Sequence, residues 1–373
     1  MRVPFFDLTR QYRSVESTIR TALDTVIESQ AFIMGRPVAE LEQSIANRLG
    51  VKAAIGCASG TDALLLPLKA LECDPGDHVL VPSFTFFATA GAVVNAGLRP
   101  VFCDVDPITF NVTPETLEAA WTDRTRAVIP VHLFGQMAPM EPIMMLARAR
   151  GVTVIEDFAQ AFGASQVIGG RKREAGSVGD VGATSFFPTK NLGGFGDGGL
   201  VTTNDERIAQ YVTRARTHGG VQMYDHEFVG TNSRLDTIQA AVVAAKLGCV
   251  DGWGDRRRRN AQMYRDILDE VEGVTTPTSA PGNEHTFNQF TIRTTRRDSL
   301  KEHLNAQNIG SKIYYPKPLH RQACFSDITW DRLPISDRLS EEVLSLPIFP
   351  ELSPDEVSFV GQAVRRFHEQ GGE

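Results

Sequence analysis

Residues 186–199 read FFPTKNLGGFGDGG, a lysine followed by five glycines, and two interpretations compete for them. The run from Gly194 to Gly199 matches G-x-G-x-x-G, a dinucleotide-binding pattern when a strand precedes it and a helix follows. The residues after Gly199, LVTT, are typical of a strand, so no helix N-terminus would face a pyrophosphate. The segment is therefore interpreted as a flexible glycine collar that lets another molecule approach Lys190. A lysine at such a position can form a Schiff base with a carbonyl cofactor.

Short apolar runs recur through the first 205 residues and alternate with helical patterns. Strands in alternation with helices predict an α/β domain whose largely parallel sheet is covered on both faces. The expected strands are 53–58, 79–83, 99–105, 127–133, 153–158, 182–187 and 199–204, and the expected helices include 61–71, 138–150 and 233–247. Seven strands make this the large domain, which we expect to span residues 1–250.

The remainder of the chain predicts a second, smaller α/β domain over residues 251–373. Its expected elements are a helix at 255–272, a strand at 287–294, a helix at 298–308, a strand at 311–315 and a last helix. Ser353 and Glu356 stand three residues apart before an apolar run, which is the spacing of a capping box. The run of four arginines at 256–259 falls in a polar helical stretch and is interpreted as a solvated helix face.

Composition restricts the class of protein. The 373 residues carry a net charge of −7, which disfavours a nucleic-acid binder because phosphate contacts need a basic surface. Five widely spaced cysteines without a C-x-x-C pair suit a reducing compartment better than a disulfide framework or a zinc site. The polar N-terminus lacks the apolar core of a signal peptide, and no apolar run approaches the ~20 residues of a membrane span. We expect a cytoplasmic protein without a metal site.

Pyridoxal 5'-phosphate (PLP) is a carbonyl cofactor for which the chain offers a complete set of partners. Asp157 ends the apolar strand that begins at residue 153, at the carboxyl edge where open α/β sheets bind ligands. A carboxylate there would keep the ring nitrogen protonated, so that the ring acts as an electron sink. The alternative role for Asp157 is that of a loop or helix-capping residue. Gln160 could form a hydrogen bond to the phenolic oxygen of the ring.

The phosphate and the ring face of PLP also have candidate partners. Ser59, Gly60 and Thr61 follow strand 53–58 and open helix 61–71, which makes an anion site of the helix-terminus type. A simple N-cap is the alternative there, and both roles are compatible. Ser185, five residues before Lys190, could add a hydroxyl. One phenylalanine of PSFTFFAT, residues 82–89, could stack on the ring while the others belong to the core.

With these residues identified, the chain resembles the DegT/DnrJ/EryC1/StrS family of sugar aminotransferases, which share fold type I with aspartate aminotransferase. The matching stretches are PFFDLTRQY, GTDAL, PSFTFFATAGAVVNAGLRPVFCDVD, PVHLFGQ, IEDFAQAFGA, SFFPTKNLGGFGDGG and NSRLDTIQAA between residues 4 and about 247, with a weaker YYPKPLHRQ at 314–322. The resemblance implies PLP as the cofactor, a large domain with a seven-stranded, mostly parallel sheet, and a homodimer with shared active sites.

The resemblance also implies roles for individual residues. Lys190 is similar to the Schiff-base lysine, Asp157 to the partner of the ring nitrogen and Gln160 to its neighbour at the phenolic oxygen. The other implied contacts are Gly60, Thr61 and Ser185 with the phosphate, Phe86 with the ring, Asn232 with the phosphate in the neighbouring subunit, and Arg234, Tyr315 and His320 with the substrate. Tyr314 departs from the family pattern, because many members have histidine before Tyr-Pro.

Three functions are compatible with a PLP site of this kind. The first is an aminotransferase that moves an amino group, from L-glutamate, onto the keto carbon of a nucleotide-linked hexose, with a 3-keto sugar favoured. The second is a sugar dehydratase of the same family, but such enzymes replace the lysine with histidine and Lys190 argues against it. The third is a non-catalytic regulator that binds the cofactor, which would need an output module for which the chain has no room. We predict the aminotransferase.

Overall fold

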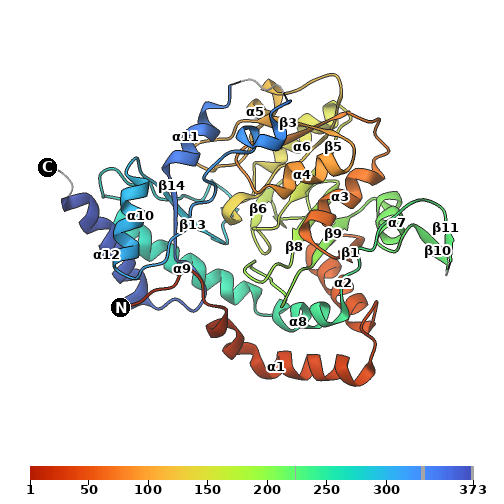
Figure 1. The fold of residues 1–373 in the computed structure, drawn as a ribbon, viewed down its shortest axis with the longest axis horizontal. Coiled ribbons are helices and arrows are strands. Elements are labelled where there is room, and N and C mark those ends of the chain that lie inside the picture. Colours follow the sequence, from red (N-terminus) through yellow and green to blue (C-terminus); the bar gives the residue numbers. More distant parts are fainter. Residues whose placement is uncertain (223, 329–331, 371–373) are drawn as a thin grey trace.

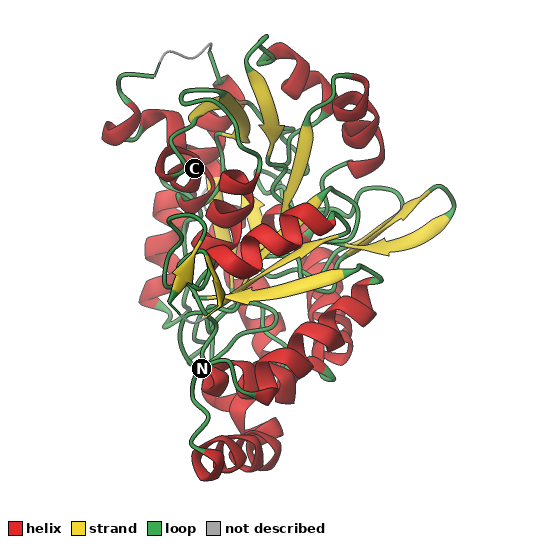
Figure 2. Ribbon diagram, turned by 90° about the vertical axis from the view of Figure 1, so that its right-hand side faces the viewer, coloured by secondary structure: helices red, strands yellow, loops and turns green. Residues whose placement is uncertain are grey.

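The computed structural model describes residues 1–222, 224–328 and 332–370. Its largest sheet has seven strands in the order β1-β9-β8-β5-β4-β2-β3. Helices surround the strands of the molecule (Figures 1 and 2). The strands of this sheet are β1 (Ala53–Cys57), β2 (His78–Pro82), β3 (Arg99–Cys103), β4 (Thr125–Val128), β5 (Thr153–Asp157), β8 (Val181–Ser185) and β9 (Gly199–Thr203). All neighbours are parallel except β9, which is antiparallel to β1 and to β8. The predicted seven-stranded, mostly parallel sheet is confirmed.

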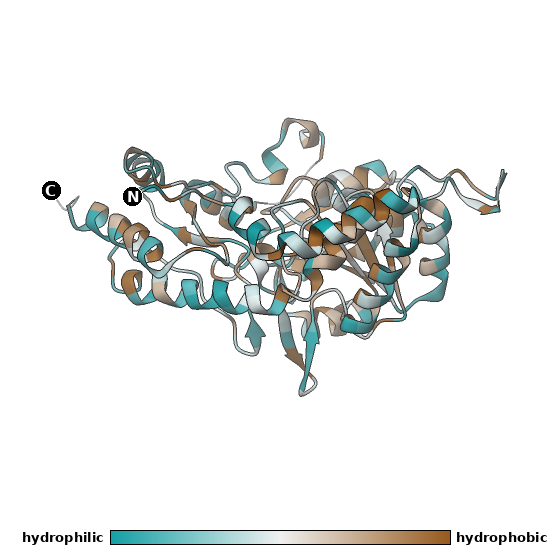
Figure 3. Cartoon of the chain, turned by 90° about the horizontal axis from the view of Figure 1, so that it is seen from below, coloured by the Kyte–Doolittle hydropathy of each residue, from teal (hydrophilic) through white to brown (hydrophobic). Residues whose placement is uncertain are grey.

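Helices cover both faces of this sheet, because alternate side chains of each strand point to opposite faces. Leu80 of β2 lies in a core with α2 (Arg36–Leu49), α5 (Pro114–Ala119), α6 (Met140–Ala149) and α8 (Thr237–Leu247). Val79 and Val81 of the same strand lie in a core with α3 (Gly60–Ala70), α4 (Ala88–Asn95) and α7 (Glu206–Ala215). The most hydrophobic segments accordingly lie toward the middle of the molecule (Figure 3).

A separate core forms where the two ends of the chain meet. The helix α9 (Val250–Leu268) runs from the large sheet to this core, which also contains β13 (Phe290–Arg293), α10 (Arg297–Ala306), β14 (Val343–Leu346) and α12 (Pro354–Gln370) (Figure 1). Val3 is fully buried there and pairs with Ile309. The helix α1 (Leu8–Ser29) then leads back along α8. The first residues therefore pack with the C-terminal part of the chain, although the expected small domain begins at residue 251.

Several small elements escaped the sequence analysis. A three-stranded sheet contains β6 (Ser165–Ile168), β7 (Arg171–Glu174) and β12 (Asn283–Glu284), and a hairpin contains β10 (Gly220–Gln222) and β11 (Asp225–His226). The turn between β6 and β7 is Gly169-Gly170, with φ of 55° and 74°. Paired glycines of positive φ are typical of a two-residue hairpin turn, so the Gly-Gly pair in the sequence could have predicted this hairpin. Figure 1 shows β10 and β11 extending away from the body of the molecule.

The expected strand at 311–315 is wrong. Lys312 forms only an isolated bridge with Ser345, because the chain then turns toward the large sheet and Pro316 and Pro318 have no N–H to extend a ladder. The segment continues through η2 (Leu319–Arg321), η3 (Ala323–Phe325) and α11 (Pro334–Glu342).

The prediction that the arginines at 256–259 form a solvated helix face is also wrong at one position. Arg257 is 2% exposed and donates hydrogen bonds to the carbonyl oxygens of Phe287 (3.2 Å) and Ile348 (2.6 Å). The capping box before α12 is confirmed, since the Ser353 N–H donates to Glu356 Oε2 (2.9 Å) and the Glu356 N–H to Ser353 Oγ (3.2 Å).

Candidate active site

Lys190 lies in a turn just beyond the carboxyl end of β8, with its N–H bonded to the carbonyl of Phe187 (2.9 Å). Its side chain is half-buried. Burial lowers the pKa of the Lys190 ammonium, while the negative charge of Asp157 acts in the opposite direction. The two predicted catalytic residues, which come from neighbouring strands, are thus within electrostatic reach of one another at the carboxyl edge of the sheet.

The glycine collar around Lys190 is packed, which corrects the interpretation that it is flexible. The Lys246 ammonium donates a hydrogen bond to the Gly193 carbonyl (2.7 Å), and Gln239 Oε1 accepts one from the Phe195 N–H (2.7 Å). A β-carbon on Gly193 would lie 2.5 Å from the Pro188 carbonyl oxygen. Glycine is therefore required here for close packing against α8 and the turn that holds Lys190.

Asp157 ends β5 and is 7% exposed. One carboxylate oxygen accepts a hydrogen bond from Thr89 Oγ1 (2.9 Å) and the other from the Ala159 N–H (3.2 Å). Burial raises the pKa of Asp157, and these two donors together with the charge of Lys190 oppose the rise. Each oxygen still has a lone pair free for a further donor, so a protonated ring nitrogen would complete the set and favour the ionised carboxylate.

Gln160 and Tyr315 bond to each other beside Asp157. The Gln160 amide donates to the Tyr315 hydroxyl (3.0 Å) and accepts from the Phe134 N–H (2.8 Å), which fixes its orientation. Burial raises the pKa of Tyr315, so the phenol is neutral and keeps a proton to donate. Tyr315 was expected to contact the substrate, and the structure places its hydroxyl against the residue expected at the phenolic oxygen of PLP.

The three residues predicted at the phosphate are brought together by strand pairing. Cys57 of β1 and Ser185 of β8 both pair with Gly199 of β9, which aligns the end of β8 with the loop that starts α3. A β-carbon on Gly60 would lie 2.6 Å from the β-carbon of Ser185, so the two residues are in direct contact. The first N–H groups of α3, from Gly60 and Thr61, have no partner within the helix and are available to an anion.

Phe86 has the exposure expected of a ring that stacks on a ligand. It is 56% exposed, and its ring centroid lies 6.3 Å from that of Tyr315. Phe84 is fully buried, and Phe87 stacks on Phe325 with the ring planes 22° apart. Of the three phenylalanines, Phe86 is therefore the one placed to cover a cofactor.

Asn232 and Arg234 flank a residue that contacts the start of α3. Ser233 Oγ donates to Asp62 (2.8 Å) and accepts from the Ala58 N–H (3.2 Å). Asn232 is exposed and Arg234 is half-buried. The contacts of Ser233 bring this segment to within one helical turn of Gly60 and Thr61 in its own chain.

His320 is fixed inside the protein. It is 1% exposed, with Nδ1 2.5 Å from Ser83 Oγ and Nε2 3.1 Å from an Asp337 carboxylate oxygen. Burial lowers the pKa of His320 against the opposing charge of Asp337. These contacts connect the end of β2 with α11, and the predicted contact of His320 with the substrate stays a prediction.

Comparison with known proteins agrees with this geometry. Residues 13–365 match the model of the DegT/DnrJ/EryC1/StrS aminotransferase family. The chain belongs to this family. It is 44% identical to a UDP-N-acetyl-3-dehydro-alpha-D-glucosamine 3-aminotransferase of Acidithiobacillus ferrooxidans, over 98% of this chain and 97% of the relative. It is also 44% identical to a pleiotropic regulatory protein of Geobacillus stearothermophilus, over 99% of both chains.

Solved structures of the family superpose closely. The structure of S. venezuelae DesV in complex with a ketimine intermediate has a TM-score of 0.95 and 39% identity over 99% of both chains. A DegT DnrJ EryC1 StrS aminotransferase from Brucella abortus has a TM-score of 0.94 and 40% identity over 100% of both chains. The predicted fold type I, the aminotransferase activity and PLP as the cofactor are thereby confirmed.

The groups that this DegT-family chain brings together at the site suit PLP. A lysine amine, a carboxylate with a free lone pair, an exposed aromatic ring and a helix N-terminus in contact with a serine hydroxyl are the groups that the cofactor requires. When bound, PLP supplies a carbonyl that takes up the amino group and a ring that accepts electrons.

Sequence reasoning missed Thr89, which holds the Asp157 carboxylate from α4. Its position at the end of PSFTFFAT, beside the predicted aromatic, was the available signal.

No helix among the described residues is long and apolar enough to cross a membrane.

Proposed function

We propose that this chain is a cytoplasmic PLP-dependent aminotransferase that moves an amino group from L-glutamate to the keto carbon of a nucleotide-linked 3-keto hexose. The observation that carries the proposal is the meeting of Lys190 and Asp157 at the carboxyl edge of β8 and β5, with Ser185 packed on Gly60 beside them. Lys190 Nζ would hold the cofactor at its carbonyl and would then move the proton of the amino transfer. Asp157 holds the ring nitrogen in its protonated form.

The names of relatives support a sugar substrate and amination at carbon 3. Besides the A. ferrooxidans relative, a UDP-2-acetamido-2-deoxy-3-oxo-D-glucuronate aminotransferase of Pseudomonas aeruginosa is 38% identical over 97% of this chain. A dTDP-3-amino-3,4,6-trideoxy-alpha-D-glucose transaminase of Streptomyces venezuelae is 38% identical over 99% of it. All three names give a nucleotide-linked sugar with a keto or an amino group at carbon 3, which supports a 3-keto hexose as the substrate.

The proposed active unit is a homodimer with shared sites. Asn232 is exposed beside the start of α3, and Phe86, Phe187 and Phe195 around the Lys190 segment are 56%, 48% and 46% exposed. Apolar rings at this density around a site are typical of a surface that another protein covers. A two-fold axis through this surface would let Asn232 of each chain reach the phosphate site of the other.

The two alternatives receive less support. A dehydratase of this family would lack the lysine, and Lys190 is present with a carboxylate beside it. A non-catalytic regulator is suggested by the name of the G. stearothermophilus relative. A non-catalytic regulator could bind the cofactor through a phosphate site and would not also need Lys190 to be paired electrostatically with Asp157.

The test combines covalent trapping with a substrate panel. Borohydride reduction of the protein with PLP should fix the cofactor on the peptide that contains Lys190, and Lys190→Ala should abolish the label while the exposed Lys301→Ala does not. Incubation with L-glutamate and UDP- or dTDP-linked 3-keto and 4-keto hexoses should yield an amino sugar fastest from a 3-keto substrate. A label on another lysine, or no amino sugar from any member of the panel, would overturn the proposal.

A further inference from the structure

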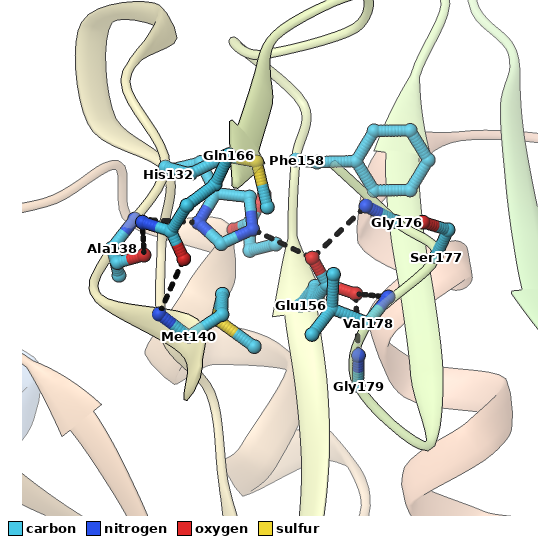
Figure 4. A network of polar contacts seen from close by, with 12 residues as sticks. His132, Ala138, Met140, Glu156, Phe158, Gln166, Gly176, Ser177, Val178 and Gly179 are labelled. Carbon is cyan, nitrogen blue, oxygen red and sulfur yellow. Dashed lines mark hydrogen bonds and ion pairs between the residues drawn. The ribbon is translucent and has the colours of Figure 1, made fainter. Parts of the chain in front are cut away.

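Glu156, the residue before Asp157 in β5, forms a fully buried polar pair with His132 (Figure 4). The His132 Nε2 lies 2.8 Å from Glu156 Oε2. The same carboxylate accepts three backbone N–H groups, from Gly176 (3.0 Å), Val178 (2.7 Å) and Gly179 (2.6 Å). All four hydrogen bonds converge on one side chain of β5, the strand that carries Asp157.

The hydrogen bonds locate the protons of this pair. The Ala138 N–H can only donate, and it points to His132 Nδ1 (3.2 Å), so the imidazole proton is on Nε2 and is donated to Glu156. Every partner of the carboxylate is thus a donor, which favours the ionised form. Burial alone would raise the pKa of Glu156, but the hydrogen bonds from His132 and the backbone hold it below its usual range. The pair therefore carries a buried negative charge next to the catalytic centre.

Glu156 ties β5 to the start of the strand that leads to Lys190. Residues 176–179 run directly into β8, whose Gly182 pairs with Glu156 and whose Ala183 pairs with Asp157. The loop cannot move away easily, because Thr202 Oγ1 donates to the Gly176 carbonyl (2.6 Å). A β-carbon on Gly176 would lie 2.4 Å from the Phe158 ring, so the loop sits as close to β5 as glycine permits.

His132 fixes the other side of the site. Its own N–H donates to the Asp157 carbonyl (2.9 Å), while its side chain holds the turn that ends at Ala138. Within that turn, the Phe134 N–H donates to Gln160 Oε1 (2.8 Å). The orientation of Gln160 therefore depends on the turn that His132 holds.

We propose that Glu156 and His132 are positioning residues. They hold the turn that contacts Gln160, the strand that ends at Asp157 and the strand that leads to Lys190 in fixed positions around the cofactor. The pair touches neither cofactor nor substrate and acts through these three residues. The inference rests on the roles proposed above for Lys190 and Asp157.

The test uses Glu156→Gln, which keeps the shape of the side chain. Whichever way the amide is oriented, its NH2 group faces two donors, either His132 with Gly176 or Val178 with Gly179. Loss of the negative charge should lower the apparent pKa of the lysine-linked cofactor, titrated by its absorbance without substrate, by on the order of one unit. Displacement of the catalytic groups should slow amino transfer on the order of 10- to 100-fold at saturating substrate.

Two further variants distinguish the effect of displaced catalytic groups from the effect of a lost charge and from a general loss of stability. His132→Gln leaves the charge unchanged but replaces the rigid ring that accepts from Ala138 with a flexible amide, so it should slow amino transfer with a smaller change in the absorbance pKa. Glu174→Gln is the matched control, because the Glu174 carboxylate on β7 binds Arg48 of α2 (2.9 Å), and both readouts should remain as in the wild type.

The outcomes distinguish this inference from the proposed function. If the wild-type protein forms no lysine-linked cofactor, the proposed function fails. If it does, and folded Glu156→Gln and His132→Gln keep the wild-type absorbance pKa and rate, the positioning role is refuted. Should Glu156→Gln fail to fold, His132→Gln decides: a slower reaction with cofactor still bound supports the role, and an unchanged rate refutes it.

Discussion

Gly60, the first residue of α3, is in contact with Ser185, the last residue of β8. The contact leaves no room for a side-chain atom on the glycine. A β-carbon at position 60 would lie 2.6 Å from the Ser185 β-carbon and 3.1 Å from its hydroxyl oxygen. The contact brings a helix N-terminus and a serine hydroxyl to one point, which is the geometry that a phosphate needs.

Gly60→Ala should weaken binding of the cofactor. The added methyl group must push Ser185 away from α3, which removes about one charge-assisted hydrogen bond and raises the Kd for PLP on the order of 10-fold. Fluorescence or absorbance titration of the apoprotein measures this. Gly252→Ala in α9, where a β-carbon would meet nothing within 4 Å, is the control and should leave the affinity unchanged.

Asp157→Asn should keep the fold and some cofactor binding but lose turnover on the order of 100-fold or more. The amide cannot stabilise a protonated ring nitrogen, but its oxygen can accept from the Ala159 N–H while its NH2 group donates to the Thr89 hydroxyl. Single-turnover kinetics with glutamate give the rate. Thr89→Val, which removes one donor and leaves the carboxylate, should cost less. Near-normal turnover in Asp157→Asn would contradict the assigned role.

Asn232→Ala should weaken cofactor retention through the partner chain. If each site is completed by the other subunit, a mixture of inactive Asn232→Ala and Lys190→Ala chains forms dimers in which one site has both residues intact. Mixed dimers, isolated by two affinity tags, should then recover partial activity. Full activity in a proven monomer, or no recovery in verified mixed dimers, argues against shared sites.

Arg257→Met should reduce the free energy of unfolding by about 2–4 kcal/mol. The substitution leaves the carbonyl groups of Phe287 and Ile348 without their buried donor. Burial lowers the pKa of Arg257 to about 10, so the guanidinium stays charged at neutral pH. Urea denaturation measures the loss. The exposed Arg259→Ala in the same helix should change stability by no more than about 0.5 kcal/mol.

Glu356 should make the fold sensitive to acid. Its carboxylate accepts two hydrogen bonds from Arg10, at 2.8 Å each, which together with the Ser353 N–H hold the pKa of Glu356 below its usual range. A folded pKa below the unfolded value means that this stabilisation is complete above about pH 4.5 and is lost as the pH falls through the folded pKa.

Glu356→Gln should therefore lose about 1–3 kcal/mol at pH 7 and show a shallower decline of stability below pH 4.5 than the wild type. Denaturation series at several pH values give both quantities. Glu369→Gln, whose carboxylate pairs with Arg365 in the next helical turn and is 62% exposed, should follow the wild-type curve.

The sequence was informative where one local pattern determines one element. The apolar runs of the seven strands are buried on both faces, so each could be found without knowledge of its neighbours. Asp157 ends one of these strands, and Lys190 lies in the turn that follows another. Their meeting could be expected, because parallel strands end at one edge of the sheet.

Contacts that depend on packing between distant segments could not be predicted. Arg257 has the composition of a solvated helix face, and only the position of two carbonyl groups from later segments makes it buried. The glycines after Lys190 indicate freedom of the backbone when taken alone, whereas Lys246 and Gln239, about fifty residues later, hold that segment in place. Pairing of Glu156 with His132 likewise requires the register of β4 and β5.

The burial of Val3 among residues of the C-terminal core has a consequence for biosynthesis. Its N–H donates to the Asn308 carbonyl (3.1 Å), and its carbonyl accepts from the Gly310 N–H (2.8 Å). The backbone of Val3 therefore lacks these partners until Asn308 and Gly310 have been translated. Contacts of such long sequence separation are slow to form, so closure of this core is expected to be a late event of folding, after the sheet that carries Lys190 has assembled.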